Sequence, residues 1–279
     1  MLISFNVWLK DLSGFKALSK EISKAGFNGV ELSLDYPLCF EEDIPRYVID
    51  ALNVEGLTLG IHLPWRDIAL ASPIEYVREA SLKAVSQCLN KIRGLKTEYV
   101  LTHMTTDQVE CGYKDLKCIE SGRKSLEFLI EEVKELGTKL LVETTRSRCC
   151  SRDDQLSTLL KDLKDVGVCL DIPHLIEQRY RRFKSLPTIN NLFKELPPDV
   201  LERTSLIHFH GYSLTNEGFV SHIKPKEDQV GELLDAIISL SNRRDFIGVV
   251  LEVFKDETSK SIEPKDLKYV VKRLKFDDT

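Results

Sequence analysis

The sequence lacks several features that would assign a protein to a class directly. No apolar run approaches the roughly 20 residues that span a bilayer, and residues 1–15 contain neither the basic stretch nor the small-residue cleavage site of a signal peptide. The 7 cysteines include no Cys-x-x-Cys pair and are too few for a disulfide scaffold. With a net charge of −5 at pH 7, the chain also has no overall basic surface for nucleic acid. We therefore expect a cytoplasmic protein, outside any membrane, whose thiols are mostly reduced.

The sequence does contain enough apolar material for one large core. Apolar residues make up 42% of the 279 residues and charged residues 30%, a balance typical of a folded globular chain. No low-complexity linker and no long unpatterned stretch divides the chain. We therefore predict a single domain over residues 1–279.

Short apolar runs alternate with amphipathic stretches along the whole chain. The runs are rich in β-branched and aromatic residues and have the length of strands. They cover residues 3–8, 29–34, 57–63, 97–103, 139–145, 166–172, 205–210 and 246–254. The intervening stretches have the apolar spacing of helices. They cover residues 15–25, 44–52, 73–92, 116–136, 156–163, 189–196, 230–240 and 267–274. Ser72 and Pro73 suit the N-cap and first turn of the third helix, and Gly137 suits the end of the fourth.

This alternation predicts an α/β fold. Strands that alternate with helices form a parallel sheet, and eight such units fit a closed (β/α)8 or TIM barrel of roughly 250 residues. The alternative, an open doubly wound sheet, often carries a GxGxxG turn after its first strand, and residues 8–15 contain none. We therefore predict a TIM barrel whose active site lies at the C-terminal ends of its strands.

Titratable residues are concentrated where the predicted strands end. Each of them alone would suit a hydrogen-bonded structural residue. Together they form a set that includes all 6 histidines of the chain. The set is His62, His103, Glu143, Asp171, His174, His208, His210, His222 and Glu252.

Three carboxylates in one barrel mouth would repel one another and lose their hydration. A divalent cation removes that cost. Glu143, Asp171, His208 and Glu252 offer three oxygen ligands and one nitrogen, which suits Mn, Mg, Co or Zn. His208 and His210 share one face of their strand, so either could be the ligand; we assign His208 to the metal and His210 to the substrate.

The remaining histidines suggest further sites. His62, His103 and Glu143 would form a second site of the His2Glu type, which favours zinc. Glu143 would then bridge two metals about 3.5–4 Å apart. His174 and His222 would either complete a third metal site or bind substrate oxygens. We expect one to three divalent ions, Zn or Mn, with His222 among the metal ligands and His174, Glu143 and Glu252 among the catalytic residues.

Arginines follow two of the predicted strands, on a chain that is acidic overall. They are Arg146, Arg179, Arg181 and Arg182. Guanidinium groups match phosphate geometry, so we predict that these arginines, together with Trp65, bind an anionic small molecule or a nucleic acid. The alternative is a solvated helix start whose arginines form salt bridges.

Two other features leave alternatives open. Cys111 and Cys118 follow one predicted strand, and Cys149 and Cys150 follow the next, so a disulfide or a metal contact between these loops is possible on spacing alone. Ordinary free thiols are the interpretation that we favour. Glu31 is either structural or an acceptor that orients a ligand such as His62.

At these residues the chain resembles the xylose isomerase-like barrel superfamily, which contains endonuclease IV and many sugar isomerases and epimerases. The shared pattern is Glu143, the run from Asp171 to His174, His208 and Glu252. Two features are more similar to endonuclease IV: the segment HLPWRDIALASP that begins at His62, and a histidine at position 103. The resemblance implies a zinc site at His62 and His103. The third zinc of that family uses an Asp-Arg-His run, where this chain reads Val220-Ser221-His222.

The leading hypothesis is a divalent-metal hydrolase of the endonuclease IV-like type that acts on a phosphate ester, including abasic DNA. The alternative is a metal-dependent sugar or sugar-phosphate isomerase or epimerase, in which Glu143 and Glu252 exchange a carbon-bound proton. Lyase or amidohydrolase chemistry and a non-catalytic binding barrel are further alternatives. Two or more bound metals would favour hydrolysis, and one would favour isomerisation.

Overall fold

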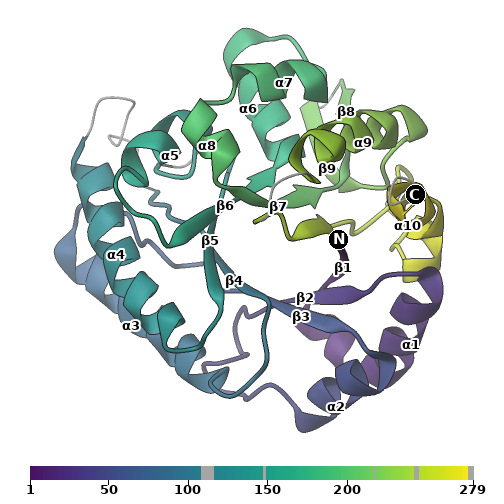
Figure 1. The fold of residues 1–279 in the computed structure, drawn as a ribbon, viewed down its shortest axis with the longest axis horizontal. Helices are drawn as coiled ribbons and strands as arrows, with labels where there is room; N and C mark the ends of the chain where they lie inside the picture. Colours follow the sequence, from purple (N-terminus) through teal and green to yellow (C-terminus); the bar gives the residue numbers. More distant parts are fainter. Residues whose placement is uncertain (108–115, 147–148, 217, 242–244, 276–279) are drawn as a thin grey trace.

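A closed barrel of parallel strands forms the middle of the protein (Figure 1). The computed structural model describes residues 1–107, 116–146, 149–216, 218–241 and 245–275. The strand order around the barrel is β1-β10-β7-β6-β5-β4-β3-β2. The bounds are β1 (Leu2–Val7), β2 (Gly29–Ser33), β3 (Thr58–His62), β4 (Tyr99–Thr102), β5 (Lys139–Glu143), β6 (Val166–Asp171), β7 (Thr204–Phe209) and β10 (Gly248–Leu251). Each strand falls on one predicted run, so the predicted TIM barrel is confirmed.

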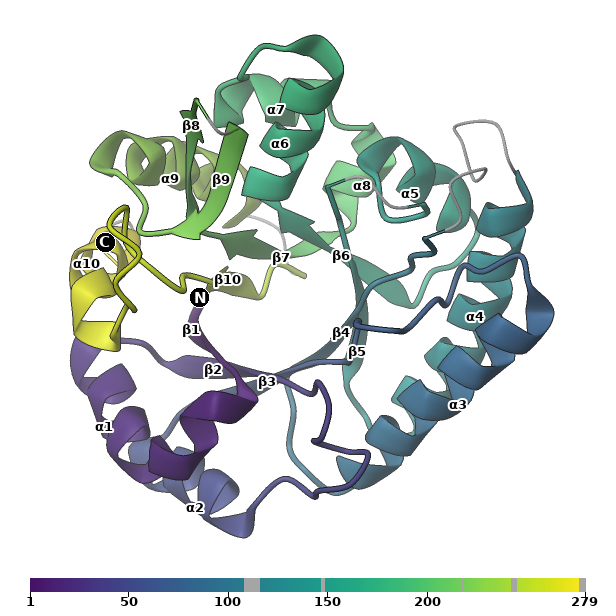
Figure 2. The same ribbon diagram turned by 180° about the vertical axis from the view of Figure 1, so that it is seen from behind.

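The helices form a ring around the outside of the barrel, as both views show (Figures 1 and 2). Their bounds are α1 (Phe15–Ala25), α2 (Arg46–Glu55), α3 (Glu75–Lys91), α4 (Leu116–Lys134), α5 (Asp153–Leu159), α6 (Ile172–Phe183), α7 (Ile189–Glu195), α8 (Pro198–Glu202), α9 (Glu227–Ser241) and α10 (Lys268–Lys275), with short 3-10 helices at Leu9–Gly14 and Pro264–Leu267. Among the described residues, no helix has the length and apolar character needed to cross a membrane.

Alternate residues of each strand face two different cores, because successive side chains of a strand point to opposite faces. One core lies between the barrel wall and the helices, and it includes Val100 and Val249. A smaller, separate core includes Leu101, Leu141 and Val250, and these residues face the barrel interior. Every side chain that continues an inward series beyond the end of its strand therefore enters the barrel mouth.

The predicted start of the third helix is wrong. The helix begins at Glu75 and its N-cap is Ile74, which has no capping side chain. Ser72 instead accepts a hydrogen bond from the backbone N–H of Ile74 at 3.2 Å, and the preceding Ala71 donates its N–H to the carbonyl of Thr105. These bonds tie the segment to the loop after β4 and delay the start of the helix.

The arginine-rich segment after β6 is a helix rather than a loop. Asp171 is the N-cap of α6 and accepts the backbone N–H of His174 at 2.8 Å, and Pro173 occupies the first turn. These are strong helix-start signals, and they place Arg179, Arg181 and Arg182 on a helix. The segment that carries His222 is an antiparallel hairpin of β8 (Gly211–Thr215) and β9 (Gly218–Ile223).

The cysteines agree only in part with the expectation of reduced thiols. Cys118 is disulfide-bonded, and Cys111 lies outside the described residues. Cys39, Cys88 and Cys169 are buried free thiols. The sulfur atoms of Cys149 and Cys150 lie 2.6 Å apart in the loop after β5.

Gly60 on β3 has no room for a side chain. A Cβ atom at this position would overlap the ring of Tyr99, which is fully buried. We expect Gly60→Ala to lower the free energy of unfolding by about 1–3 kcal/mol, because the ring must leave a packed position. Urea denaturation measures this change.

The matched control is Gly231→Ala in α9, where a Cβ atom would meet nothing within 4 Å. It should raise the free energy of unfolding by about 0.5–1 kcal/mol. Equal stability of Gly60→Ala and the wild type would contradict the packing argument.

Candidate metal centre

The titratable residues at the barrel mouth continue the inward series of their strands. Glu143 follows Leu141 by two positions on β5, and Glu252 follows Val250 by two positions after β10. His103, Asp171 and His208 stand in the same relation to inward-facing residues of β4, β6 and β7. They are buried or nearly so, with His208 and Asp171 at 0% exposure. The predicted set is thus brought together in one place.

One carboxylate oxygen of Glu143 contacts three histidines. Its Oε2 lies 3.1 Å from Nε2 of His103, 3.2 Å from Nε2 of His62 and 3.5 Å from Nδ1 of His208. His62, His103 and Glu143 form a group whose ligand atoms all lie within 4.8 Å of one another. This group has the composition that we predicted for a second metal site.

The predicted quartet is brought together by two overlapping groups. Glu143, Asp171 and His208 form one group within the same 4.8 Å limit, and Asp171, His210 and Glu252 form another. Nδ1 of His208 also lies 3.9 Å from Oε2 of Glu252. Glu143 and Glu252 thus approach the same histidine from β5 and from the end of β10, which are not adjacent in the barrel.

Two buried polar atoms of the quartet have no hydrogen-bond partner. They are Nδ1 of His208 and Oδ2 of Asp171. A buried polar atom without a partner costs free energy, and both atoms are metal donors beside carboxylates that would otherwise repel one another. The residues present therefore fit a divalent metal ion, since oxygen and imidazole ligands suit Mg, Mn and Zn.

Glu31 on β2 determines which nitrogen of His208 faces the carboxylates. Its carboxylate accepts hydrogen bonds from Tyr99 at 2.9 Å, from Asn6 at 3.0 Å and from Nε2 of His208 at 3.0 Å. The proton of His208 that Glu31 binds is therefore on Nε2, and Nδ1 is the nitrogen that remains for a ligand. The sequence suggested His62 as the histidine that Glu31 orients, whereas the hydrogen bond goes to His208.

The pKa values of Glu143 and Glu252 are shifted in opposite directions. Burial opposes ionisation of Glu143, but His208 and His103 outweigh it and hold the pKa of Glu143 well below its usual range. Burial raises the pKa of Glu252 to about 8, despite the attraction of His208. At neutral pH, Glu143 is therefore the ionised partner and Glu252 the protonated one.

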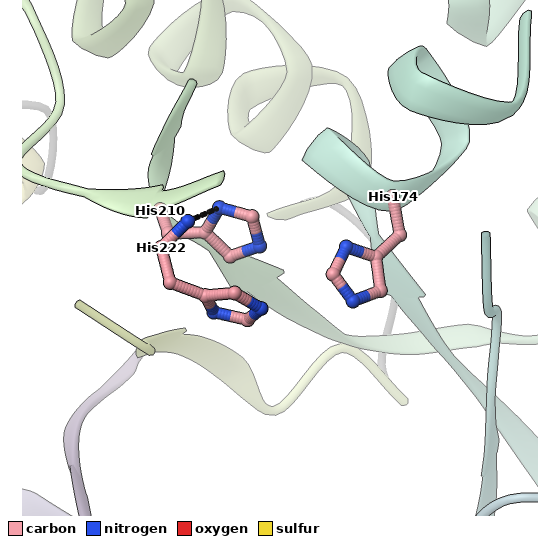
Figure 3. A group of neighbouring side chains, drawn as sticks. All are labelled: His174, His210 and His222. Carbon is pink, nitrogen blue, oxygen red and sulfur yellow. Dashed lines mark hydrogen bonds between the residues drawn. The ribbon is translucent and has the colours of Figure 1, made fainter. Parts of the chain in front are cut away.

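Three histidines form a separate cluster beside the quartet (Figure 3). His174 comes from the first turn of α6, His210 follows β7, and His222 lies on β9. The rings of His210 and His222 are 3.9 Å apart, and the ring of His174 lies 5.3 Å from that of His210. The structure thus places His210 with His174 and His222, where the sequence had put only the latter two together.

The predicted substrate-binding arginines differ in their surroundings. Arg146 reaches the histidine cluster, with its Nη2 atom 3.3 Å from Nε2 of His174. Arg179 pairs with Asp153 and Glu195, which joins α6 to α5 and α7. Arg181 pairs with Glu177 of its own helix at 2.6 Å, and Arg182 is exposed and lies over the ring of Phe183. A substrate role for these arginines remains a prediction, and Arg146 is the best placed.

Aromatic side chains at the mouth were largely missed from the sequence. Trp65 was included, and its ring lies 5.6 Å from that of His103. Trp8 and Phe254 were not, although the ring of Phe254 stacks on His222 at 4.7 Å and contacts Trp8 at 5.6 Å. Trp8 lies two positions after Asn6 and Phe254 two positions after Glu252, so the inward series was the signal that could have found them.

A closed (β/α)8 barrel with buried His, Glu and Asp clusters at one end defines a TIM barrel whose clusters could hold divalent metal ions. The chain belongs to the xylose isomerase-like TIM barrel family, whose model matches residues 19–275. No curated protein sequence matches it.

Solved structures with the same fold include two kinds of enzyme. D-psicose 3-epimerase from Clostridium cellulolyticum is 14% identical, with a TM-score of 0.69 over 100% of this chain and 98% of that one. The 3-keto-D-glucoside 4-epimerase of E. coli is 14% identical, with a TM-score of 0.67 over 97% and 98%. Endonuclease IV from Thermus thermophilus is 17% identical, with a TM-score of 0.64 over 100% of both chains. At these identities the similarity shows the fold.

Glu143 belongs to two of the donor groups, so its loss should affect both. We expect Glu143→Gln to lower zinc affinity by more than ~100-fold, beyond the loss expected when an outer contact is removed. Competition with a chromophoric chelator measures the affinity. Glu132→Gln is the control, because Glu132 lies on α4, pairs with Arg93 and is in none of the donor groups. Zinc binding by Glu143→Gln equal to that of the control would contradict the assignment.

The protonation of His62 predicts how metal binding depends on pH. Burial lowers the pKa of His62, but the hydrogen bond and charge of Glu143 outweigh burial and raise this pKa to about 9. Metal ions bind neutral imidazole, so binding must release this proton. Zinc affinity should therefore rise with pH between about pH 6 and 9, by about tenfold per pH unit for the His62 proton and more where Glu252 also loses its proton. His62→Gln should make this dependence less steep, and an affinity that stays constant over the same range in the wild type would speak against it.

Proposed function

We propose that the protein is a divalent-metal-dependent isomerase or epimerase that acts on a sugar or sugar phosphate. The observation that carries the proposal is the position of two buried carboxylates, Glu143 and Glu252, which both approach the same nitrogen of His208. Their oxygens lie 3.5 Å and 3.9 Å from its Nδ1 atom, and they come from non-adjacent strands of the barrel. Two carboxylates that face one small volume suit the removal of a carbon-bound proton on one side and its return on the other.

The two carboxylates also differ in their proton affinity. Glu143 is held ionised, while the pKa of Glu252 is raised to about 8. A pair of carboxyl groups whose pKa values are pushed apart supplies one base and one acid at neutral pH. In the metal-free centre, Glu143 is thus suited to accept a proton and Glu252 to donate one.

Glu143, Asp171, His208 and Glu252 would hold the metal, which is Mn or Zn from the mixture of three oxygen ligands and one nitrogen. When bound, a divalent ion polarises a carbonyl or hydroxyl group of the substrate and so acidifies the adjacent carbon. The protein residues around it bind and orient the substrate. Arg146 would meet a phosphate or hydroxyl group, and Trp65 would cover an apolar face of the sugar.

The fold comparison supports this choice. Epimerases of sugars are prominent among the structures that share the fold. The proposed reaction also requires only the one metal ion that the quartet would hold. The salt bridges of Arg179 and Arg181 also reduce the free positive charge that a polyanionic substrate would need.

A second candidate function is hydrolysis of a phosphate ester, including abasic DNA. The observation that favours it is the group of His62, His103 and Glu143, which would hold a second metal that a one-metal isomerase does not require. Paired metals that share a carboxylate activate water and stabilise phosphoryl oxygens. The partner would then be a nucleic acid or a smaller phosphodiester.

The test is incubation of the metal-loaded protein with D-psicose, D-tagatose, D-fructose and L-ribulose in deuterated water. We expect conversion of at least one ketose, with deuterium entering at the carbon that is inverted in an epimerisation or at the carbonyl carbon that is reduced in an isomerisation. Glu252→Gln should lower this rate by about 10²–10⁴-fold, because it removes a general acid. Glu257→Gln is the matched control, since Glu257 forms an exposed ion pair with Lys226.

Parallel assays with abasic-site DNA and a chromogenic phosphodiester separate the two candidates. Cleavage of either compound without turnover of any ketose would replace the proposed isomerase by the hydrolase. Ketose turnover that persists in Glu252→Gln at the wild-type rate would contradict the acid–base pair.

A further inference from the structure

The cluster of His174, His210 and His222 has the outward form of a three-histidine metal site (Figure 3). One nitrogen of each ring lies within 4.8 Å of one nitrogen of the other two. A neutral imidazole has one lone pair, and its other nitrogen carries the proton. The cluster can bind a metal only if the lone pairs that face its interior are free.

The lone pair of His210 is already used. The backbone N–H of His222 donates to Nδ1 of His210 at 3.0 Å, which is the dashed line in Figure 3. A backbone N–H is always a donor, so Nδ1 is the unprotonated nitrogen and the proton is on Nε2. The carbonyl oxygen of Gly211 lies 3.2 Å from the same Nδ1. A proton on Nδ1 would satisfy that carbonyl, but it would collide with the amide hydrogen of His222.

The same reasoning applies to His174. Its Nε2 atom lies 3.3 Å from Nη2 of Arg146. A guanidinium group has only donors, so Nε2 accepts and the ring proton is on Nδ1. In His222, Nδ1 lies 3.2 Å from the carbonyl oxygen of Glu252, which can only accept. The cluster therefore retains one lone pair, on Nε2 of His222.

The two remaining ring N–H groups lie near one acceptor. Nδ1 of His174 is 3.5 Å, and Nε2 of His210 is 3.6 Å, from Oδ1 of Asp171. Both nitrogens are buried and have no hydrogen-bond partner, and Oδ1 of Asp171 is an acceptor that they face just beyond hydrogen-bond distance. The backbone N–H of His174 donates to this oxygen at 2.8 Å. Oδ1 of Asp171 thus accepts one hydrogen bond and faces two ring N–H groups, while Oδ2 is left without a partner.

We propose that His174 and His210 are positioning residues whose ring N–H groups face Oδ1 of Asp171, and that this cluster is not a third metal site. The donors on Oδ1 leave Oδ2 as the oxygen for the metal of the quartet, so the inference rests on the metal centre proposed above. His208 provides the contrast: Glu31 accepts the hydrogen bond of its Nε2 proton, so Nδ1 is the nitrogen that a metal can bind, whereas the partners of His174 and His210 leave their protons facing the centre.

The experiment compares His210→Asn with His210→Gln. The Asn side chain places an oxygen near the position of Nδ1, so it can still accept the N–H of His222, but it has no donor near Nε2. The Gln side chain extends an amide N–H to that position. We measure the number of zinc ions bound per chain by elemental analysis, and the affinity of each by chelator competition.

We expect His210→Asn to bind as many zinc ions as the wild type, with one of them held about tenfold more weakly, as for the loss of an outer hydrogen bond to a ligand. His210→Gln should recover most of that affinity. Loss of one zinc ion per chain in His210→Asn, with the affinity of the others unchanged, would show a third metal site and overturn the proposal.

Long-range ¹⁵N–¹H spectra of the histidine-labelled protein provide a second readout that does not depend on activity. We expect a proton on Nε2 of His210 and on Nδ1 of His174, both before and after zinc is added. A zinc-bound ring nitrogen on either residue would overturn the proposal. If the wild type bound no zinc, the proposed metal centre would be contradicted. These spectra would still show where the two protons lie.

Discussion

The barrel mouth depends on the contact between one carboxylate oxygen and three imidazole rings. Oε2 of Glu143 is shared by His62, His103 and His208, which come from three different strands. Without these rings, a carboxylate buried at this depth would lose its hydration with no compensation. The histidines therefore have a structural role even before any metal binds, since they allow a negative charge to exist inside the barrel.

Around this contact, a second layer of hydrogen bonds determines which atoms face inward. Glu31 binds one nitrogen of His208 and leaves the other for a ligand. His222 and Arg146 do the reverse for His210 and His174. The same imidazole side chain is thus a metal ligand or a hydrogen-bond donor, depending on which neighbour is hydrogen-bonded to its other nitrogen. Proximity of nitrogen atoms is therefore insufficient to identify a metal site.

Much of the fold was predictable because its signals are local. Each barrel strand is a short apolar run, and residues at strand ends converge in a closed barrel by geometry, so Glu143 and Glu252 could be placed together. The start of α3 was missed because bonds to the loop after β4 override the signal at Ser72 and Pro73. The sequence left a helix start open as the alternative for the arginines after β6, and the N-cap at Asp171 with Pro173 in the first turn is the local signal that decides for α6. The role of His210 was beyond prediction, since it depends on a backbone N–H from a hairpin strand that lies further along the chain.

The N-cap of α6 joins the helix to the chemistry of the site. Asp171 ends β6, begins α6 and contributes to the donor groups, so its position satisfies three requirements at once. Arg179 ties the same helix to α5 and α7. The packing of α6 among the outer helices is therefore linked thermodynamically to ion binding at the centre of the barrel. An ion that binds only when Asp171 is in place would stabilise the docked helix by the same free energy. Conversely, any partner that bound at the surface and loosened α6 would lower the affinity for that ion without entering the barrel mouth.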